Sequence, residues 1–256
     1  MMHSLPDHNQ IFSVQFPNGH TAQAIRVRQE DDPAAVLRML GFQRARPVIF
    51  ISGGASKMSE EDKQRTREMI NALVAFADVH DIVVIDGGTE SGIMKMIGDT
   101  RHSGGYTFPL LGVSPLGRVT YPGYQNPNQQ ADLEDNHSHF VLVDGEEWGD
   151  ESRMIVRLTQ ALCGKDKHAV GVLINGGKIA MQEVYLATST TRRMPIIVLE
   201  GSGRAADEIS TAFRSGFSSQ RILKAILAGG DIQLVGTLEG PAALRRKLEN
   251  QFSATL

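Results

Sequence analysis

The sequence has little of several features on which common protein functions depend. Among its 256 residues there is a single cysteine, Cys163, which excludes a disulfide framework and a cysteine-based metal cluster. Lys and Arg number 26 against 29 Asp and Glu, and a net charge of −3 argues against binding nucleic acid or an anionic membrane through bulk charge. No apolar run reaches the roughly 18 residues that span a bilayer, and residues 1–10 lack the basic and apolar segments of a secretory signal. We therefore expect a cytoplasmic protein whose partners include neither nucleic acid nor a membrane.

The pattern of apolar residues predicts the fold class. Short continuous apolar runs, typical of strands covered on both faces, predict strands at 48–51, 82–85, 110–113, 140–143, 170–174, 196–199 and 232–235. Helical patterns lie between them, chiefly at 59–80, 93–101, 154–162 and 181–190. Alternation at 12–16 and 21–28 around a Pro-Asn-Gly turn predicts a hairpin, and Asp32-Pro33 then opens a short helix.

These elements predict an α/β protein with a Rossmann-like, open, mostly parallel sheet, helices on both faces, and a preceding N-terminal β-hairpin. We expect residues 1–44 to pack on a main domain formed by residues 45–256. The stretch 121–136, rich in Pro, Gly, Asn and Gln, is predicted to be a long functional or mobile loop.

Glycine is the residue whose placement is informative. Nine of the 26 glycines lie in four loops where a predicted strand ends and a helix begins. The carboxyl ends of parallel strands meet at one sheet edge, where ligands bind. Glycine loops and helix N-termini there can hold a phosphate through backbone N–H groups without an excess of Lys or Arg. The alternative is that each glycine pair only forms a tight turn, but four such loops at one edge favour a nucleotide or phosphate site. The residues expected to bind it are Gly53, Gly54, Gly87, Gly88, Thr89, Gly92, Asn175, Gly176, Gly177, Gly201, Ser202 and Gly203.

Four segments resemble a known family and occur in its order. They read GGTESGIMKMIGD at 87–99, LGVSPLGR at 111–118, LEDNHSHFVLVD at 133–144 and PIIVLEGSG at 195–203. These resemble the motifs of the SLOG superfamily, and more narrowly the SLOG domain of TRPM channels in its prokaryotic form, also called LSDAT. Leu116 stands where the family motif has Trp. The resemblance covers roughly residues 45–215 and implies a Rossmann-like fold and a nucleotide-derived ligand such as ADP-ribose, NAD or a related signalling nucleotide.

The same superfamily contains the Lonely Guy phosphoribohydrolases, whose second motif is PGGxGTxxE. Here the segment from Asn175 to Glu183 reads NGGKIAMQE, which keeps the two glycines and the acid. Asn175, Ile179 and Ala180 replace the Pro, the third Gly and the Thr. This departure weakens the expected phosphate cradle and favours binding over Lonely Guy catalysis.

Several charged residues could contribute chemistry at the glycine loops. Glu183 could stabilise positive charge on a ribose during N-glycosidic cleavage, or only complement a helix dipole. The Lonely Guy enzymes place a catalytic arginine on the helix before this motif, and the resemblance makes Arg153, which shares a helix face with Arg157, a candidate for that role; the alternative is a solvated helix face. Three more charged side chains are expected to bind the ligand. Lys95 and Arg204 could bind a phosphate, and Glu200 could accept hydrogen bonds from ribose hydroxyls. The alternative for each is a charged residue at an exposed strand end.

His137 and His139 have the spacing of a ligand pair for a metal, but no third ligand with suitable spacing follows, so we expect no metal. His137 is instead expected to hydrogen-bond a loop or line the ligand site.

Three functions stay open at this point. The first is a sensor domain that binds a nucleotide, requires no other cofactor, and acts through a homo-oligomer or an effector protein. The second is a hydrolase of nucleotides, either a phosphoribohydrolase or an NAD-cleaving N-glycosidase, that uses Glu183. The third is a purely structural assembly module. The four glycine loops without an intact catalytic motif favour the sensor.

Overall fold

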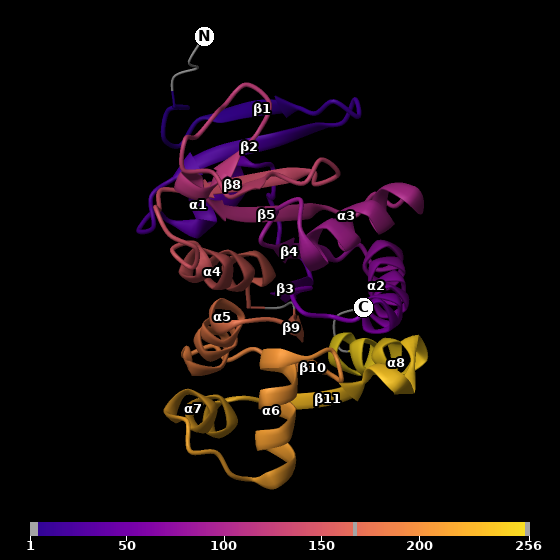
Figure 1. Cartoon of the computed structure of the whole chain (residues 1–256). Coiled ribbons are helices and arrows are strands. Elements are labelled where there is room, and N and C mark those ends of the chain that lie inside the picture. Colours follow the sequence, from indigo (N-terminus) through magenta and orange to yellow (C-terminus); the bar gives the residue numbers. More distant parts are fainter. Residues whose placement is uncertain (1–4, 166–167, 254–256) are drawn as a thin grey trace.

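A computed structural model describes residues 5–165 and 168–253, which form a nine-stranded sheet with helices on both sides (Figure 1). The strand order is β1-β2-β8-β5-β4-β3-β9-β10-β11. All neighbouring strands are parallel except the β1–β2 pair. The strands are β1 (Ile11–Gln15), β2 (Thr21–Val27), β3 (Val48–Gly54), β4 (Val83–Asp86), β5 (Leu110–Pro115), β8 (His139–Val143), β9 (Ala169–Asn175), β10 (Ile196–Glu200) and β11 (Ile232–Gly236).

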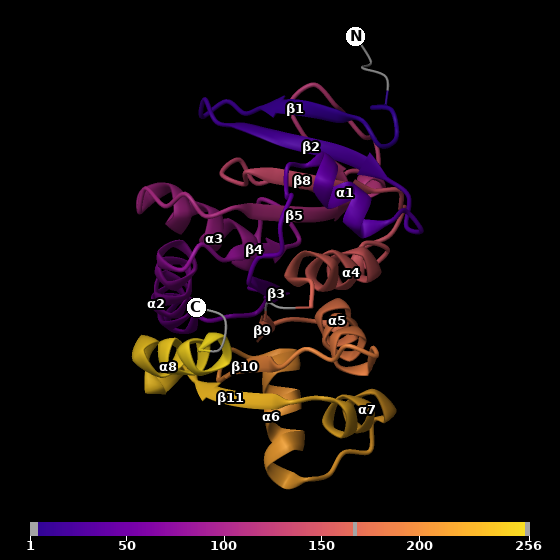
Figure 2. The same cartoon turned by 180° about the vertical axis from the view of Figure 1, so that it is seen from behind.

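Two groups of helices cover the two faces of the sheet. One face carries α1 (Pro33–Met39), α4 (Ser152–Cys163), α5 (Lys178–Ser189), α6 (Arg204–Ser215) and α7 (Arg221–Gly229). The other carries α2 (Glu60–Val79), α3 (Gly92–Ser103) and α8 (Pro241–Phe252). Figures 1 and 2 show these two layers from opposite sides of the molecule. Each face of the sheet buries its own apolar cluster, which explains why the central strands have continuous rather than alternating apolar residues.

The expected fold class is confirmed, and the strand order places its switch point between β3 and β9. From β3 the chain moves through β4, β5 and β8 toward one edge, whereas from β9 it moves through β10 and β11 toward the other. At the carboxyl ends of these two central strands, Gly54 is paired with Asn175. In an open parallel sheet the crevice at such a reversal is the usual ligand site.

The predicted N-terminal hairpin and short helix are also present. Asp32 caps α1 by accepting hydrogen bonds from the backbone N–H groups of Ala34 and Ala35, and Pro33 is the first helical residue. Strand β2 joins the main sheet beside β8, and α1 packs against α4. The division into residues 1–44 and 45–256 stays a prediction.

One helix boundary was predicted wrongly. Helix α5 begins at Lys178, three residues before the predicted start, so its first turn adjoins the third glycine loop. The stretch 121–136 is mostly irregular, as expected, but contains β7 (Ala131–Asp132), which pairs with β6 (Val119–Thr120). The backbone N–H of Glu90 also donates to the Asp132 carbonyl at 2.8 Å, which attaches this stretch to the second glycine loop.

Among the described residues, none of the helices combines the length and apolar character that crossing a membrane would require.

Candidate functional site

A cavity of about 510 Å³ lies at the switch point of the sheet. Its walls come from the ends of β3, β4 and β9, from the first turn of α5, and from the loop that precedes α4. It brings together seven of the residues predicted from sequence, namely Gly53, Gly54, Gly87, Thr89, Gly177, Glu183 and Arg204. Seven further residues that were not predicted to be site residues also line it, namely Ile51, Met94, Trp148, Glu151, Lys178, Ile179 and Ala180.

The first glycine pair has two different roles at this cavity. A Cβ atom on Gly53 would lie 2.1 Å from the backbone oxygen of Ile174, so only glycine lets β3 and β9 approach this closely. A Cβ atom on Gly54 would meet nothing within 4 Å. Gly53 therefore maintains the strand pairing, whereas Gly54 leaves open space at the cavity wall.

Glu183 is a buried acid facing this cavity from the second turn of α5. Its side chain accepts a hydrogen bond from the Ser52 hydroxyl of β3 and another, at 3.2 Å, from the Ser152 hydroxyl of α4. Only 6% of the residue is exposed. Burial, reinforced by the nearby Glu151 carboxyl, raises the pKa of Glu183 to about 7. At neutral pH this group can both hold and release a proton.

Glu151, which sequence reasoning missed, is a second buried acid in the same cavity. It precedes α4, accepts a 2.8 Å hydrogen bond from the backbone N–H of Gly149, and is 5% exposed. Burial raises the pKa of Glu151 to about 7 as well. Its neighbour Ser152 bonds Glu183, so the two acids are linked through the start of one helix. The one available sequence signal was an acid three residues before the predicted helix at 154–162, a position where acids are common because they complement the helix dipole.

Two cations and one aromatic ring complete the cavity. Lys178 and Arg204 lie at the first residues of α5 and α6. A Cβ atom on Gly177 would come within 2.7 Å of an Arg204 guanidinium nitrogen, so the guanidinium lies against the third glycine loop. Trp148, the sole tryptophan of the chain, lines the same space and donates its indole N–H to Gln130 at 2.6 Å.

The first turn of α5 presents backbone donors to the cavity. Gly177, Lys178, Ile179 and Ala180 all line it, and no side chain caps the helix start. Uncapped N–H groups and the helix dipole favour an anion at such a position. The wall therefore combines positive groups with two acids whose pKa values are raised to about 7.

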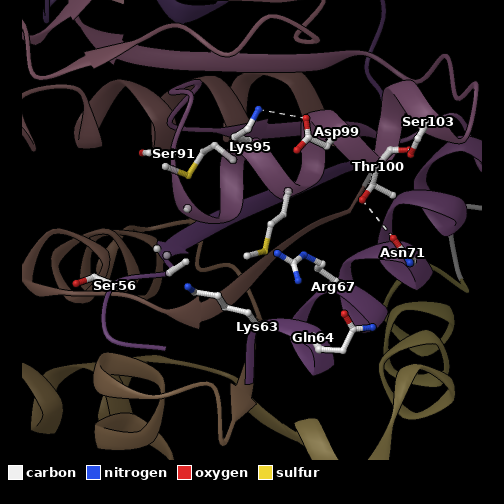
Figure 3. Close-up of a pocket in the computed structure, with 16 residues that line it drawn as sticks. Ser56, Lys63, Gln64, Arg67, Asn71, Ser91, Lys95, Asp99, Thr100 and Ser103 are labelled. Atoms are coloured by element: carbon white, nitrogen blue, oxygen red, sulfur yellow. Dashed lines mark hydrogen bonds and ion pairs between the residues drawn. The ribbon is translucent and has the colours of Figure 1, made fainter. Parts of the chain in front are cut away.

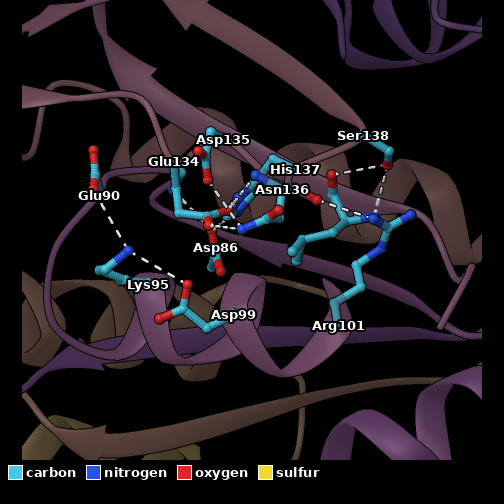
Figure 4. Close-up of polar contacts among 12 residues, drawn as sticks. Asp86, Glu90, Lys95, Asp99, Arg101, Glu134, Asp135, Asn136, His137 and Ser138 are labelled. Carbon is cyan, nitrogen blue, oxygen red and sulfur yellow. Dashed lines mark hydrogen bonds and ion pairs between the residues drawn. The ribbon is translucent and has the colours of Figure 1, made fainter. Parts of the chain in front are cut away.

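His137 is not part of the cavity lining but contacts Asp86, the residue before the second glycine loop, and Glu134 (Figure 4). Its Nε2 is 2.8 Å from Asp86 Oδ1 and its Nδ1 is 2.6 Å from Glu134 Oε2, and all three side chains are fully buried. Burial alone would lower the pKa of His137, but the two carboxylates raise it to about 9. The charged ring thus donates to both acids, and Asp86 also accepts the backbone N–H of Gly88 at 2.7 Å. His137 thus supports the second glycine loop through Asp86, and its expected role in ligand binding stays a prediction.

Comparison with known proteins identifies the family of the chain. The model of the family described as SLOG in TRPM, prokaryote, matches residues 46–245. The chain belongs to this family. The transient receptor potential cation channel subfamily M member 7 of Homo sapiens is 26% identical over 231 aligned residues, which include 76% of this chain and 12% of that protein. A transient receptor potential channel of Caenorhabditis elegans is 24% identical, with 78% of this chain and 11% of that protein covered. This SLOG chain thus spans about an eighth or less of the length of these relatives.

Among solved structures, the fold is similar to the X-ray structure of TM1055, a structural genomics target. The TM-score is 0.50 at 18% sequence identity, and the match covers 78% of this chain and 99% of that one. The similarity supports the Rossmann-like architecture of this SLOG chain.

The structure separates the remaining predicted residues of the SLOG chain into three groups. Gly92 and Lys95 line a neighbouring groove between α2 and α3, and Gly176 lines a smaller cavity beside Arg204. Arg153 is exposed on α4 and is not among the residues lining the described cavities. Six others lie outside these cavity linings as well, namely Gly88, Asn175, Glu200, Gly201, Ser202 and Gly203.

Most of these outlying residues have structural contacts of their own. Asn175 donates its side-chain N–H to the Ser202 carbonyl at 2.8 Å, and the Ser202 hydroxyl accepts the Asn175 backbone N–H at 2.7 Å. These bonds connect the third and fourth glycine loops. Glu200 accepts hydrogen bonds from Nε and Nη2 of Arg214, at 2.7 and 2.5 Å, and is not part of the cavity lining.

No group of three or more His, Cys, Asp or Glu side chains within residues 5–165 and 168–253 has the arrangement of a metal site.

Proposed function

We propose that this SLOG chain is a ligand-binding domain that holds a nucleotide-derived ligand in the switch-point cavity and acts as a sensor. The observation that carries the proposal is the meeting of three glycine loops, the uncapped start of α5 and two cations in one cavity of about 510 Å³. This volume lies within the range of small-molecule sites.

The lining offers a complementary group for each part of a nucleotide. A phosphate fits the N–H groups at the start of α5, with Lys178 and Arg204 beside it. The ribose hydroxyls fit the carboxyls of Glu151 and Glu183, which accept or donate a hydrogen bond according to their protonation. A base can stack on Trp148. ADP-ribose, NAD and AMP all contain these parts.

The raised pKa values of the two acids predict a pH-dependent affinity. As the pH rises from 6 to 8, Glu151 and Glu183 lose their protons, and the added negative charge opposes an anionic ligand. At an effective dielectric constant of about 20, one such charge about 12 Å from the phosphate corresponds to roughly tenfold weaker binding. Titration calorimetry with AMP at pH 6, 7 and 8 measures this decline.

A pair of matched variants tests the source of that decline. Glu183→Gln keeps the shape and an acceptor oxygen for one of the two serines but cannot lose a proton, so its affinity should fall less steeply with pH. Glu200→Gln, at an acid bound by Arg214 outside the cavity, should keep the wild-type decline. If Glu183→Gln and Glu200→Gln behave alike, Glu183 does not face the ligand.

A nucleotide hydrolase is the second candidate, and the pair of buried acids favours it. Two carboxyl groups with pKa values about 7 in one cavity resemble the acid and base of N-glycosidic cleavage. Incubation with AMP and with NAD, followed by chromatography, should then show a released base that disappears in Glu183→Gln. A wild type that binds nucleotide but releases no base leaves the sensor as the function.

A further inference from the structure

A second and larger hollow adjoins the switch-point cavity. It has a volume of about 900 Å³ and lies between α2 and α3, and we name it the α2–α3 groove (Figure 3). Gly53, Gly54 and Met94 line both this groove and the switch-point cavity. The open space beside Gly54 is therefore common to the two, with no side chain from that residue between them.

The charge of the groove differs from that of the chain. The chain as a whole carries more acids than bases, but the groove is lined by Lys63, Arg67 and Lys95 against the single acid Asp99. Figure 3 shows Lys63 and Arg67 extending from α2 into the space between the helices, whereas Lys95 on α3 directs its ammonium toward Asp99. The cations that face this hollow are therefore those of α2.

These cations are available to a ligand. Lys63 pairs with Glu60 at 2.6 Å, and Lys95 pairs with Asp99 at 3.4 Å and with Glu90 at 3.5 Å. Such solvent-exposed pairs contribute little and exchange readily for another anion. Arg67 makes no ion pair with another residue of the described part of the chain, and its side chain is exposed.

We propose that the α2–α3 groove holds a second phosphate of the ligand, so that this domain selects nucleotides with at least two linked phosphates. The inference rests on the proposed function, because the first phosphate and its nucleoside occupy the switch-point cavity. The chain of phosphates then passes Gly54, and Lys63 and Arg67 bind the second one. Arginine can bind a phosphate through two hydrogen bonds, and lysine acts as a point charge.

AMP and ADP are the probes that isolate this second phosphate, because they differ by that group alone. Titration calorimetry on the full chain should show ADP binding at least tenfold more tightly than AMP. In the double variant Lys63→Gln/Arg67→Gln, the affinity for ADP should fall to that for AMP, and AMP binding should stay within twofold of wild type. Both residues lie on the surface-facing side of α2, so the fold should persist, which circular dichroism checks.

Arg245→Gln/Arg246→Gln provides the matched control. It removes the same two charges from exposed positions on α8 that line none of the described cavities. This control should keep the preference for ADP, and an equal loss in both double variants would show that only overall charge matters and overturn the proposal.

The failure of this inference is distinguishable from the failure of the proposed function. Equal binding of AMP and ADP by the wild type would overturn the second-phosphate site and leave nucleotide binding intact. Loss of inorganic phosphate binding in Lys63→Gln/Arg67→Gln without any change for ADP would make the groove a separate anion site, which also overturns the proposal. Absence of binding for both nucleotides would reject both.

Discussion

Replacing His137 with leucine should lower the free energy of unfolding by about 3–5 kcal/mol at pH 7, the usual effect of removing one partner from a buried ionic cluster. The variant leaves Asp86 and Glu134 fully buried without the cation that both contact. Asp86 would then hold the Gly88 N–H less firmly, because the histidine fixes its position. Urea denaturation followed by circular dichroism measures the loss.

His139→Leu is the matched control for this prediction. His139 is two residues away, packs against Phe42 with ring centroids 5.0 Å apart, and hydrogen-bonds Ser138. Burial lowers the pKa of His139 to about 4, so this ring is neutral and its loss should reduce stability by only about 1 kcal/mol. Similar losses in the two variants would contradict a charged, doubly bonded His137.

The same cluster predicts how the wild type responds to pH. The pKa of His137 is raised from 6.5 to about 9 in the folded chain, so its contribution is complete below pH 6.5 and is lost as the pH rises through 9. The groups facing it are Asp86 and Glu134, with Arg101 close to Glu134 and the His20 side chain on the His137 carbonyl. The urea midpoint of both wild type and His139→Leu should therefore fall between pH 7 and pH 10.

Replacing Gly53 with alanine should also have a large effect, on stability and on the site together. The new methyl group would lie 2.1 Å from the Ile174 backbone oxygen, so β3 and β9 must separate at their carboxyl ends. Overpacking of this kind lowers the free energy of unfolding by about 1–3 kcal/mol, and here it also displaces two walls of the cavity. Ligand affinity should fall at least tenfold, as measured by calorimetry on the folded fraction.

Gly54→Ala differs from Gly53→Ala by one position and should behave differently. Its added methyl group meets no atom within 4 Å, so stability should change by less than about 0.5 kcal/mol. If the two variants lose equal stability, the close approach of β3 and β9 at Gly53 is not as described.

The fold was predictable because its signals are local. Continuous apolar runs, the Asp32-Pro33 helix start and glycines after four strands each reflect the chemistry of a few adjacent residues. The position of Glu183 near the start of a helix could also be predicted from local residues. The exact start of α5 could not be predicted, because neither Lys178 nor Ile179 is a residue type that caps or breaks a helix.

What the sequence could not provide depends on contacts between distant segments. Glu151 becomes part of the cavity only when the start of α4 packs beside α5. It then lies in the same cavity as Glu183, which is 32 residues away along the chain. His137 meets Asp86 across 51 residues, which decides that it supports a loop rather than lining the cavity. Glu200, at a strand end where a ligand contact was expected, is instead bound by Arg214.

Titration calorimetry with AMP and ADP on the wild type and on Gly54→Leu tests the central claim most directly. A leucine at this position extends into the space common to the cavity and the α2–α3 groove without contacting other protein atoms at its Cβ. The wild type should bind one nucleotide per chain, and folded Gly54→Leu should bind none detectably. A wild type without binding, or a Gly54→Leu variant with undiminished affinity, would contradict a nucleotide site at the switch point of the sheet.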